Sequence, residues 1–81
     1  MLGYRYILDE TVVEAMASRS EDEQRAWLQV FRHLAANPFL RGELQTRDSV
    51  GRVVESIVIG DFVVSVVSDH AVKEVRIVEV I

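Results

Sequence analysis

The sequence contains no cysteine, one proline and four glycines in 81 residues. Without cysteine, neither a disulfide framework nor a thiolate metal site can form, which fits a reducing cytoplasm. No apolar run of about 18 residues occurs, and the amino terminus is not basic and then apolar, so we expect neither a membrane span nor a signal peptide. His33 and His70 are isolated, and no nucleophile triad or glycine-rich phosphate loop occurs. We therefore expect no metal and no cofactor.

The charge balance is acidic, with 13 acidic and nine basic residues and a net charge of −4. Such a chain has no overall attraction for nucleic acid, although a local group of arginines can still bind phosphate. Hydrophobic residues make up 49% of the chain, which is more than one small core needs. Residues 1–81 are therefore expected to form a single domain with apolar surface to spare.

The last third of the chain, from Gly51 to Ile81, has valine or isoleucine at about every second position. β-Branched residues suit a pleated surface, and three such runs between short polar breaks predict three antiparallel strands joined as a meander. The first break, Gly60-Asp61, suits a type II′ hairpin turn and places Ile59 opposite Phe62.

This register predicts two unlike faces, because side chains alternate along a strand. The core face carries Val53, Ile57, Ile59, Phe62, Val64, Val66, Val75, Ile77 and Ile81. The opposite face mixes polar residues with six valines, Val54, Val58, Val63, Val67, Val78 and Val80. We expect these valines and the exposed edge of the last strand to bind another protein chain. The alternative is that residues 39–50 fold over them.

The first half of the chain predicts a short strand at residues 4–8 and two helices. The first helix covers about Val12 to Ala17, with Asp9 as its cap or Thr11 and Glu14 as a capping box. The second starts at a capping box of Ser20 and Glu23 and ends near Ala36, before Asn37-Pro38. Its apolar stripe is formed by Trp27, Leu28, Val30, Phe31, Leu34 and Ala35.

Residues 39–50 are irregular and predict a surface connection with a short extended piece at 43–45. The expected fold is therefore α+β in the order β-α-α-β-β-β. A two-helix hairpin packs on one face of an antiparallel sheet.

This order of elements resembles the RelE/ParE toxin superfamily of prokaryotic toxin–antitoxin systems, which is also associated with plasmid stabilization. The resemblance covers nearly the whole chain and lies in the helix ending LAANP, then FLRGEL, the VVESIVIGDFVVSVV hairpin and VRIVEVI. It implies a RelE/ParE-like fold, a cytoplasmic location and a cognate antitoxin as partner. We also expect the protein to be a homodimer when it is alone.

The two branches of the superfamily imply different activities. RelE-type members are similar in being ribosome-dependent mRNA endonucleases with basic residues on two sheet strands and near the carboxyl terminus. Arg52 matches the start of the first basic strand, whereas Val54 stands where another basic residue is expected. Asp61-Phe62-Val63 lacks the arginine that commonly opens the next strand, and no arginine, histidine or tyrosine tail follows the strand that ends at Ile81.

The ParE branch lacks these nuclease residues and acts on DNA gyrase, and a third possibility is a short or degenerate member of the superfamily that only binds a partner. The resemblance therefore favours a toxin-family protein that acts by protein binding, on an antitoxin and a gyrase-like target, without nuclease activity. The alternative is an enzyme, an mRNA interferase that binds RNA and the ribosome through a patch of Arg52, Arg76 and Arg47.

Overall fold

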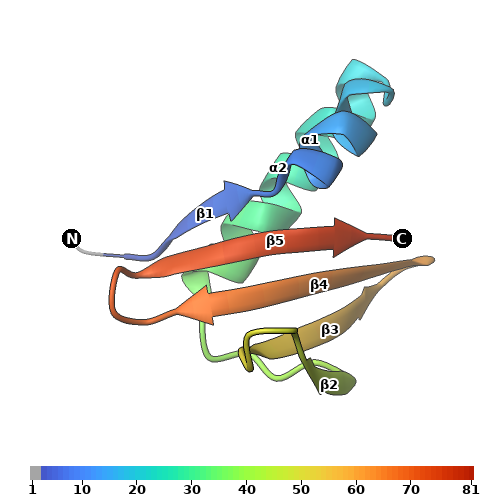
Figure 1. Cartoon of the computed structure of the whole chain (residues 1–81). Coiled ribbons are helices and arrows are strands. Elements are labelled where there is room, and N and C mark those ends of the chain that lie inside the picture. The colour runs from blue at the N-terminus through green and yellow to red at the C-terminus, as the bar shows by residue number, and fades with distance from the viewer. Residues whose placement is uncertain (1–2) are drawn as a thin grey trace.

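The computed structural model describes residues 3–81 and contains two helices and one five-stranded sheet (Figure 1). The elements are β1 (Arg5–Leu8), α1 (Glu10–Ala17), α2 (Glu21–Ala36), β2 (Leu44–Arg47), β3 (Val53–Ile59), β4 (Phe62–Asp69) and β5 (Glu74–Val80). The strand order across the sheet is β1-β5-β4-β3-β2. The predicted α+β fold is confirmed, and the extended piece expected at residues 43–45 overlaps the strand β2, which pairs with β3 as an additional strand of the sheet.

β1 pairs with β5 in parallel, with Tyr6 opposite Val75. In the sheet, β5 therefore lies between β1 and β4, and the prediction of an exposed last-strand edge is wrong. Beyond the paired region, the start of α1 covers the same edge. The Asp9 N–H donates to the Ile77 carbonyl at 3.0 Å, and Thr11 Oγ1 lies 3.5 Å from the Val78 carbonyl oxygen.

The two helices begin in different ways. At α2 the predicted capping box is present, with the Glu23 N–H donating to Ser20 Oγ and the Ser20 N–H to the Glu23 carboxylate. At α1 the N-cap position is Asp9, whose side chain makes no capping hydrogen bond. Thr11 lies inside this helix, so its predicted capping box with Glu14 is wrong.

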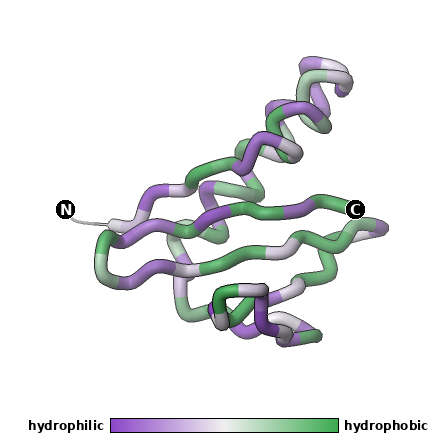
Figure 2. Tube along the Cα trace, in the orientation of Figure 1, coloured by the Kyte–Doolittle hydropathy of each residue, from purple (hydrophilic) through white to green (hydrophobic). Residues whose placement is uncertain are grey.

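The core lies between the helix pair and one face of the sheet. Phe31 of α2 and Ile77 of β5 are fully buried at its centre, as predicted. Trp27 links the two layers, with its ring 5.8 Å from that of Phe31 and 5.0 Å from that of Phe62. Figure 2 shows a long hydrophobic stretch on β4, whereas polar and apolar residues alternate along β5 and along the helices, as expected for helices that cover a sheet.

The β3–β4 hairpin has the predicted register, with Ile59 opposite Phe62 and Ile57 opposite Val64. Gly60 has a φ of +61°. Asp61 has a negative φ, because Lys73 is the one non-glycine residue with positive φ among residues 3–81. A glycine at positive φ followed by a residue at negative φ fits a type II′ turn.

A β-bulge in β5 changes the faces predicted for the end of the chain. Ser65 lies opposite Glu79 but Val66 lies opposite Ile77, so Val78 has no partner on β4. The extra residue inverts the alternation beyond it. Val80 therefore packs against the core, and placing it on the open face was wrong.

Ile81 is affected by the same bulge. It exchanges two backbone hydrogen bonds with Val63 and is 68% exposed, so its predicted core position is also wrong. Among the residues that the structure describes, no helix is long and apolar enough to cross a membrane.

Candidate functional site

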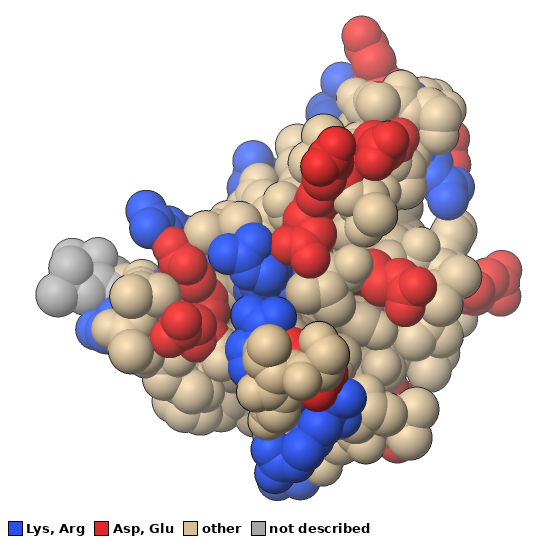
Figure 3. Space-filling model, viewed as in Figure 1, with Lys and Arg blue, Asp and Glu red and all other residues tan. Residues whose placement is uncertain are grey.

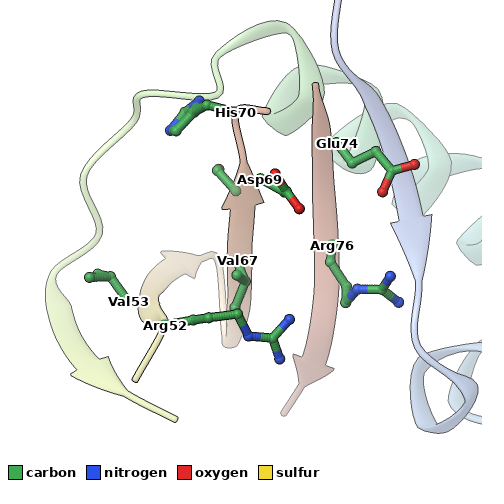
Figure 4. Close-up of a pocket in the computed structure, with 8 residues that line it drawn as sticks. Arg52, Val53, Val67, Asp69, His70, Glu74 and Arg76 are labelled. Carbon is green, nitrogen blue, oxygen red and sulfur yellow. The ribbon is translucent and has the colours of Figure 1, made fainter. Parts of the chain in front are cut away.

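A pocket of about 520 Å³ lies on the sheet face that the helices leave open. Its lining comes from the start of β3, from β4, from the β4–β5 turn and from β5, and consists of Arg52, Val53, Val67, Ser68, Asp69, His70, Glu74 and Arg76 (Figure 4). Figure 3 shows basic side chains in a column across the centre of this face, with acidic side chains on both sides.

The β4–β5 register places the pocket's central residues. Val67 lies directly opposite Arg76, and Asp69 lies opposite Glu74. These four positions share the open face because they are two residues apart on their strands. Val67 is only 5% exposed and supplies an apolar floor. The pocket therefore joins an apolar floor to charged groups of both signs.

One end of the pocket is formed by two arginines, each held by an aspartate. Arg76 Nη1 donates to Asp9 at 3.0 Å, and Arg52 Nε donates to Asp48 at 2.7 Å. The other side-chain N–H groups of both arginines have no acceptor within residues 3–81. Figure 4 shows the two guanidinium groups on the same side of the Val67 floor. Two of the three predicted catalytic arginines thus meet in one site.

The turn before β3 fixes Arg52. Asp48 Oδ1 accepts the backbone N–H groups of Val50 and Arg52 at 3.0 and 2.8 Å, and Gly51 adopts a φ of +85°. Partial burial acts to raise the pKa of Asp48, but the hydrogen bonds from Arg52 and Val50 outweigh it and lower this pKa. Asp48 therefore stays ionised and keeps Arg52 oriented.

The other end of the pocket is acidic. Glu74 pairs with Arg5 of β1, with its Oε2 3.0 Å from Arg5 Nε. Asp69 accepts the Ala71 backbone N–H at 3.1 Å. Among the described residues, no three His, Asp or Glu side chains are grouped closely enough to hold a metal ion.

An aromatic cluster borders the pocket beside the β4–β5 turn. His70 stacks on Phe39, with ring centroids 4.5 Å apart and nearly parallel, and the Tyr4 hydroxyl lies 2.7 Å from His70 Nδ1. These residues are 31 or more positions from one another, so the sequence contains no local signal for the cluster. By contrast, the Asp48–Gly51 spacing is a turn signal that could have suggested Asp48 as a partner of Arg52.

Arg47, the third predicted arginine, lies apart from this pocket. It is opposite Val53 on β2, and its Nη1 donates to the Gly51 carbonyl at 2.8 Å. It lines a separate shallow pocket with Gln45 and Thr46.

The six predicted valines do not all lie on the open face. Val58 and Val63 lie opposite each other on the open face, and Val58 is 53% exposed. Val67 is the buried pocket floor, and Val54 is half-buried opposite Thr46 of β2. Val78 is half-buried at the bulge, and Val80 belongs to the helix-covered face. Val54, Val58, Val63 and Val67 therefore share the open face, because side chains at every second position of β3 and β4 point the same way, and the exposed apolar area lies around Val58 and Val63.

Comparison with known proteins identifies the fold. No protein-family model matches the chain, and no curated protein matches its sequence. Its structure is similar to a chain from the crystal structure of the archaeal RelE–RelB complex from Pyrococcus horikoshii OT3, with a TM-score of 0.73 and 20% sequence identity. The chain has the RelE fold. The match covers 98% of this chain and 93% of the other, so it includes the helix pair and the sheet that carries the pocket.

Proposed function

We propose that the protein is the RelE-like member of a toxin–antitoxin pair and acts in the prokaryotic cytoplasm by binding other proteins, an antitoxin and a gyrase-like target. The observation that carries this proposal is the fold shared with a chain of the RelE–RelB complex over nearly the full length of both chains. That chain was crystallised in a complex, which supports an antitoxin as the partner of this one.

The charges of the pocket favour protein binding over RNA cleavage. Each pocket arginine is paired with an aspartate, Asp48 or Asp9, and the far end carries Asp69 and Glu74. The chain as a whole carries a net charge of −4. RNA phosphates would meet repulsion from these carboxylates, whereas a protein surface can present charges of both signs.

Copurification tests this proposal. The protein, tagged and coexpressed with the product of the adjacent reading frame, should form a stable complex that survives gel filtration. In a second experiment, the free tagged protein should retain DNA gyrase from a defined mixture of gyrase and albumin. A protein that binds neither would contradict the proposed function.

A second candidate function is ribosome-dependent mRNA cleavage, which one observation favours. Arg52, Arg76 and His70 line a single pocket, and arginine and histidine side chains are residue types that stabilise charge and transfer protons in enzymes. We expect no site-specific cleavage in a translating extract. Cleavage that is lost in Arg52→Ala or Arg76→Ala, but kept in the remote helix variant Arg25→Ala, would instead establish the nuclease.

A further inference from the structure

We propose that the pocket binds a segment of the partner protein that carries one acidic and one basic side chain close together. The arginine end holds the carboxylate, the Asp69 end holds the cation, and Val67 contacts the aliphatic stems. This inference rests on the proposed function, because it specifies the chemistry of the partner segment that docks on this chain.

The arginine end is preorganised for a carboxylate. Asp48 accepts a hydrogen bond from Arg52 Nε, and Asp9 accepts one from Arg76 Nη1. Each aspartate therefore occupies only one side of its guanidinium group. The remaining N–H donors of the two groups have no acceptor within residues 3–81. Arginine binds carboxylates through paired N–H donors, and a side chain that is already held loses less freedom on binding. An incoming carboxylate can therefore bind without displacing either aspartate.

The acidic end requires a cation. Asp69 and Glu74 face each other directly across β4 and β5, where like charges are destabilising. Glu74 is paired with Arg5, whereas the contact of Asp69 is with the uncharged backbone N–H of Ala71. A lysine or arginine side chain from a partner would relieve this repulsion and would pair with Asp69.

The apolar floor and the volume of the pocket are suited to two side chains of a partner segment and not to one whole face of a helix. Val67, which is 5% exposed, forms the floor, and Val53 adds an apolar wall. Long side chains can lay their methylene groups on such surfaces and keep their charged ends at the rim. The volume of about 520 Å³ is that of a small-ligand site.

The distribution of charge selects a peptide and not a nucleic acid. A single-stranded nucleic acid carries a negative charge at every nucleotide. A phosphate bound at the two arginines would therefore place the neighbouring phosphates close to the carboxylates of the acidic end, or to the aspartates that pair with the arginines. A segment with one carboxylate and one ammonium group complements both ends of the pocket.

The test is an NMR titration of the whole isotope-labelled protein. The probe is the blocked tetrapeptide Glu-Ala-Ala-Lys, compared with Gln-Ala-Ala-Lys, Glu-Ala-Ala-Gln, inorganic phosphate and a short oligouridine. We expect Glu-Ala-Ala-Lys to shift the Val67 and Asp69 amide signals and to bind about tenfold more tightly than either singly charged peptide. Equal binding of the three peptides, or tighter binding of phosphate or oligouridine, would overturn the proposal.

Charge-removing variants test the same assignment. Asp69→Asn should remove the preference for peptides that carry the lysine. The double variant Arg52→Gln, Arg76→Gln should remove the preference for peptides that carry the glutamate. The surface variant Arg25→Gln on α2 should leave both preferences intact. Circular dichroism tests whether each variant is folded. If the double arginine variant is unfolded, the result for Asp69→Asn alone decides the outcome.

The failure of this inference can be distinguished from failure of the proposed function. If coexpressed antitoxin still binds the Arg52→Gln, Arg76→Gln double variant with unchanged affinity, the pocket assignment is wrong and the proposed function stands. If the wild-type protein binds no antitoxin but retains the peptide preferences, the proposed function is wrong and the pocket chemistry stands.

Discussion

The carboxylate of Asp9 lies 3.0 Å from the guanidinium group of Arg76, although Asp9 occupies the N-cap position of α1. An aspartate at this position ordinarily accepts a backbone N–H from the first turn of its helix. Here the side chain makes no such bond. Asp9 therefore orients a pocket arginine and leaves the start of α1 without a side-chain cap.

Substitution of Asp9 should separate these two roles. Asp9→Ala removes a partly exposed ion pair and should lower the free energy of unfolding by about 0.5–1 kcal/mol. Asp9→Ser also removes the pair but can cap α1, so it should recover much of that loss. Urea denaturation measures both, with Glu10→Ala as a neighbouring control. Equal destabilisation by alanine and serine would show that capping is not available at this site.

The core prediction concerns Phe31, which is fully buried between the helices and the sheet. Phe31→Ala should lower the free energy of unfolding by about 3–5 kcal/mol, because it removes apolar contacts and leaves a cavity. Val72→Ala, at an exposed position in the β4–β5 turn, is the control and should have little effect. A loss below about 1 kcal/mol in Phe31→Ala would contradict the helix–sheet interface.

Gly42 makes a close approach that no other residue type can make without a shift. A Cβ at this position would lie 2.3 Å from the carbonyl oxygen of Ser56 on β3. Gly42→Ala should therefore displace the segment that leads into β2 and cost about 1–3 kcal/mol of stability. Gly3→Ala is a matched control, because its Cβ would meet nothing within 4 Å. Thermal denaturation should separate the two variants, and coincident curves would contradict the close contact.

Acid should destabilise the fold through Asp48 and Glu23. The pKa of Glu23 is lowered mainly by its backbone hydrogen bond with Ser20, and that of Asp48 by its bonds with Arg52 and Val50, which outweigh partial burial. Both carboxylates bind protons more readily in the unfolded chain than in the folded protein. The free energy of unfolding therefore rises with pH where these groups titrate. Their contribution is complete above the ordinary values of 4.5 and 3.8 and is lost as pH falls below them.

Urea midpoints measured between neutral and acid pH check this dependence. The double variant Glu23→Gln, Asp48→Asn keeps side-chain acceptors at both positions and should show a shallower loss of stability in acid. The non-titrating surface variant Ser49→Ala should follow the wild-type curve. An unchanged slope in the double variant would assign the acid sensitivity to other groups.

Self-association is expected through the apolar area around Val58 and Val63, where the open face remains partly exposed. Sedimentation equilibrium at micromolar concentration should show a dimer when the protein is alone. Val58→Lys should weaken this dimer, whereas Val72→Lys in the distant β4–β5 turn should not. A monomer of 9.2 kDa over the whole concentration range would contradict this prediction.

Local sequence signals predicted the helix pair, the capping box at Ser20, the turn at Gly60 and the register of the hairpin that follows it. These features depend on short-range chemistry, namely side-chain alternation, a hydroxyl near a free N–H, and the freedom of glycine at positive φ. Phe31 and Ile77 were predicted as core residues for the same reason.

Tertiary structure alone decided the rest. β1 joins β5 through contacts across more than sixty residues. The bulge that removes Val78 from the β4 ladder follows from packing along the whole strand, and it moves Val80 to the core. The pocket arginines were named from the sequence, but Asp9 is 67 residues from Arg76. A one-dimensional pattern contains the period of each strand, whereas the pairing of distant charges depends on how the strands meet in space.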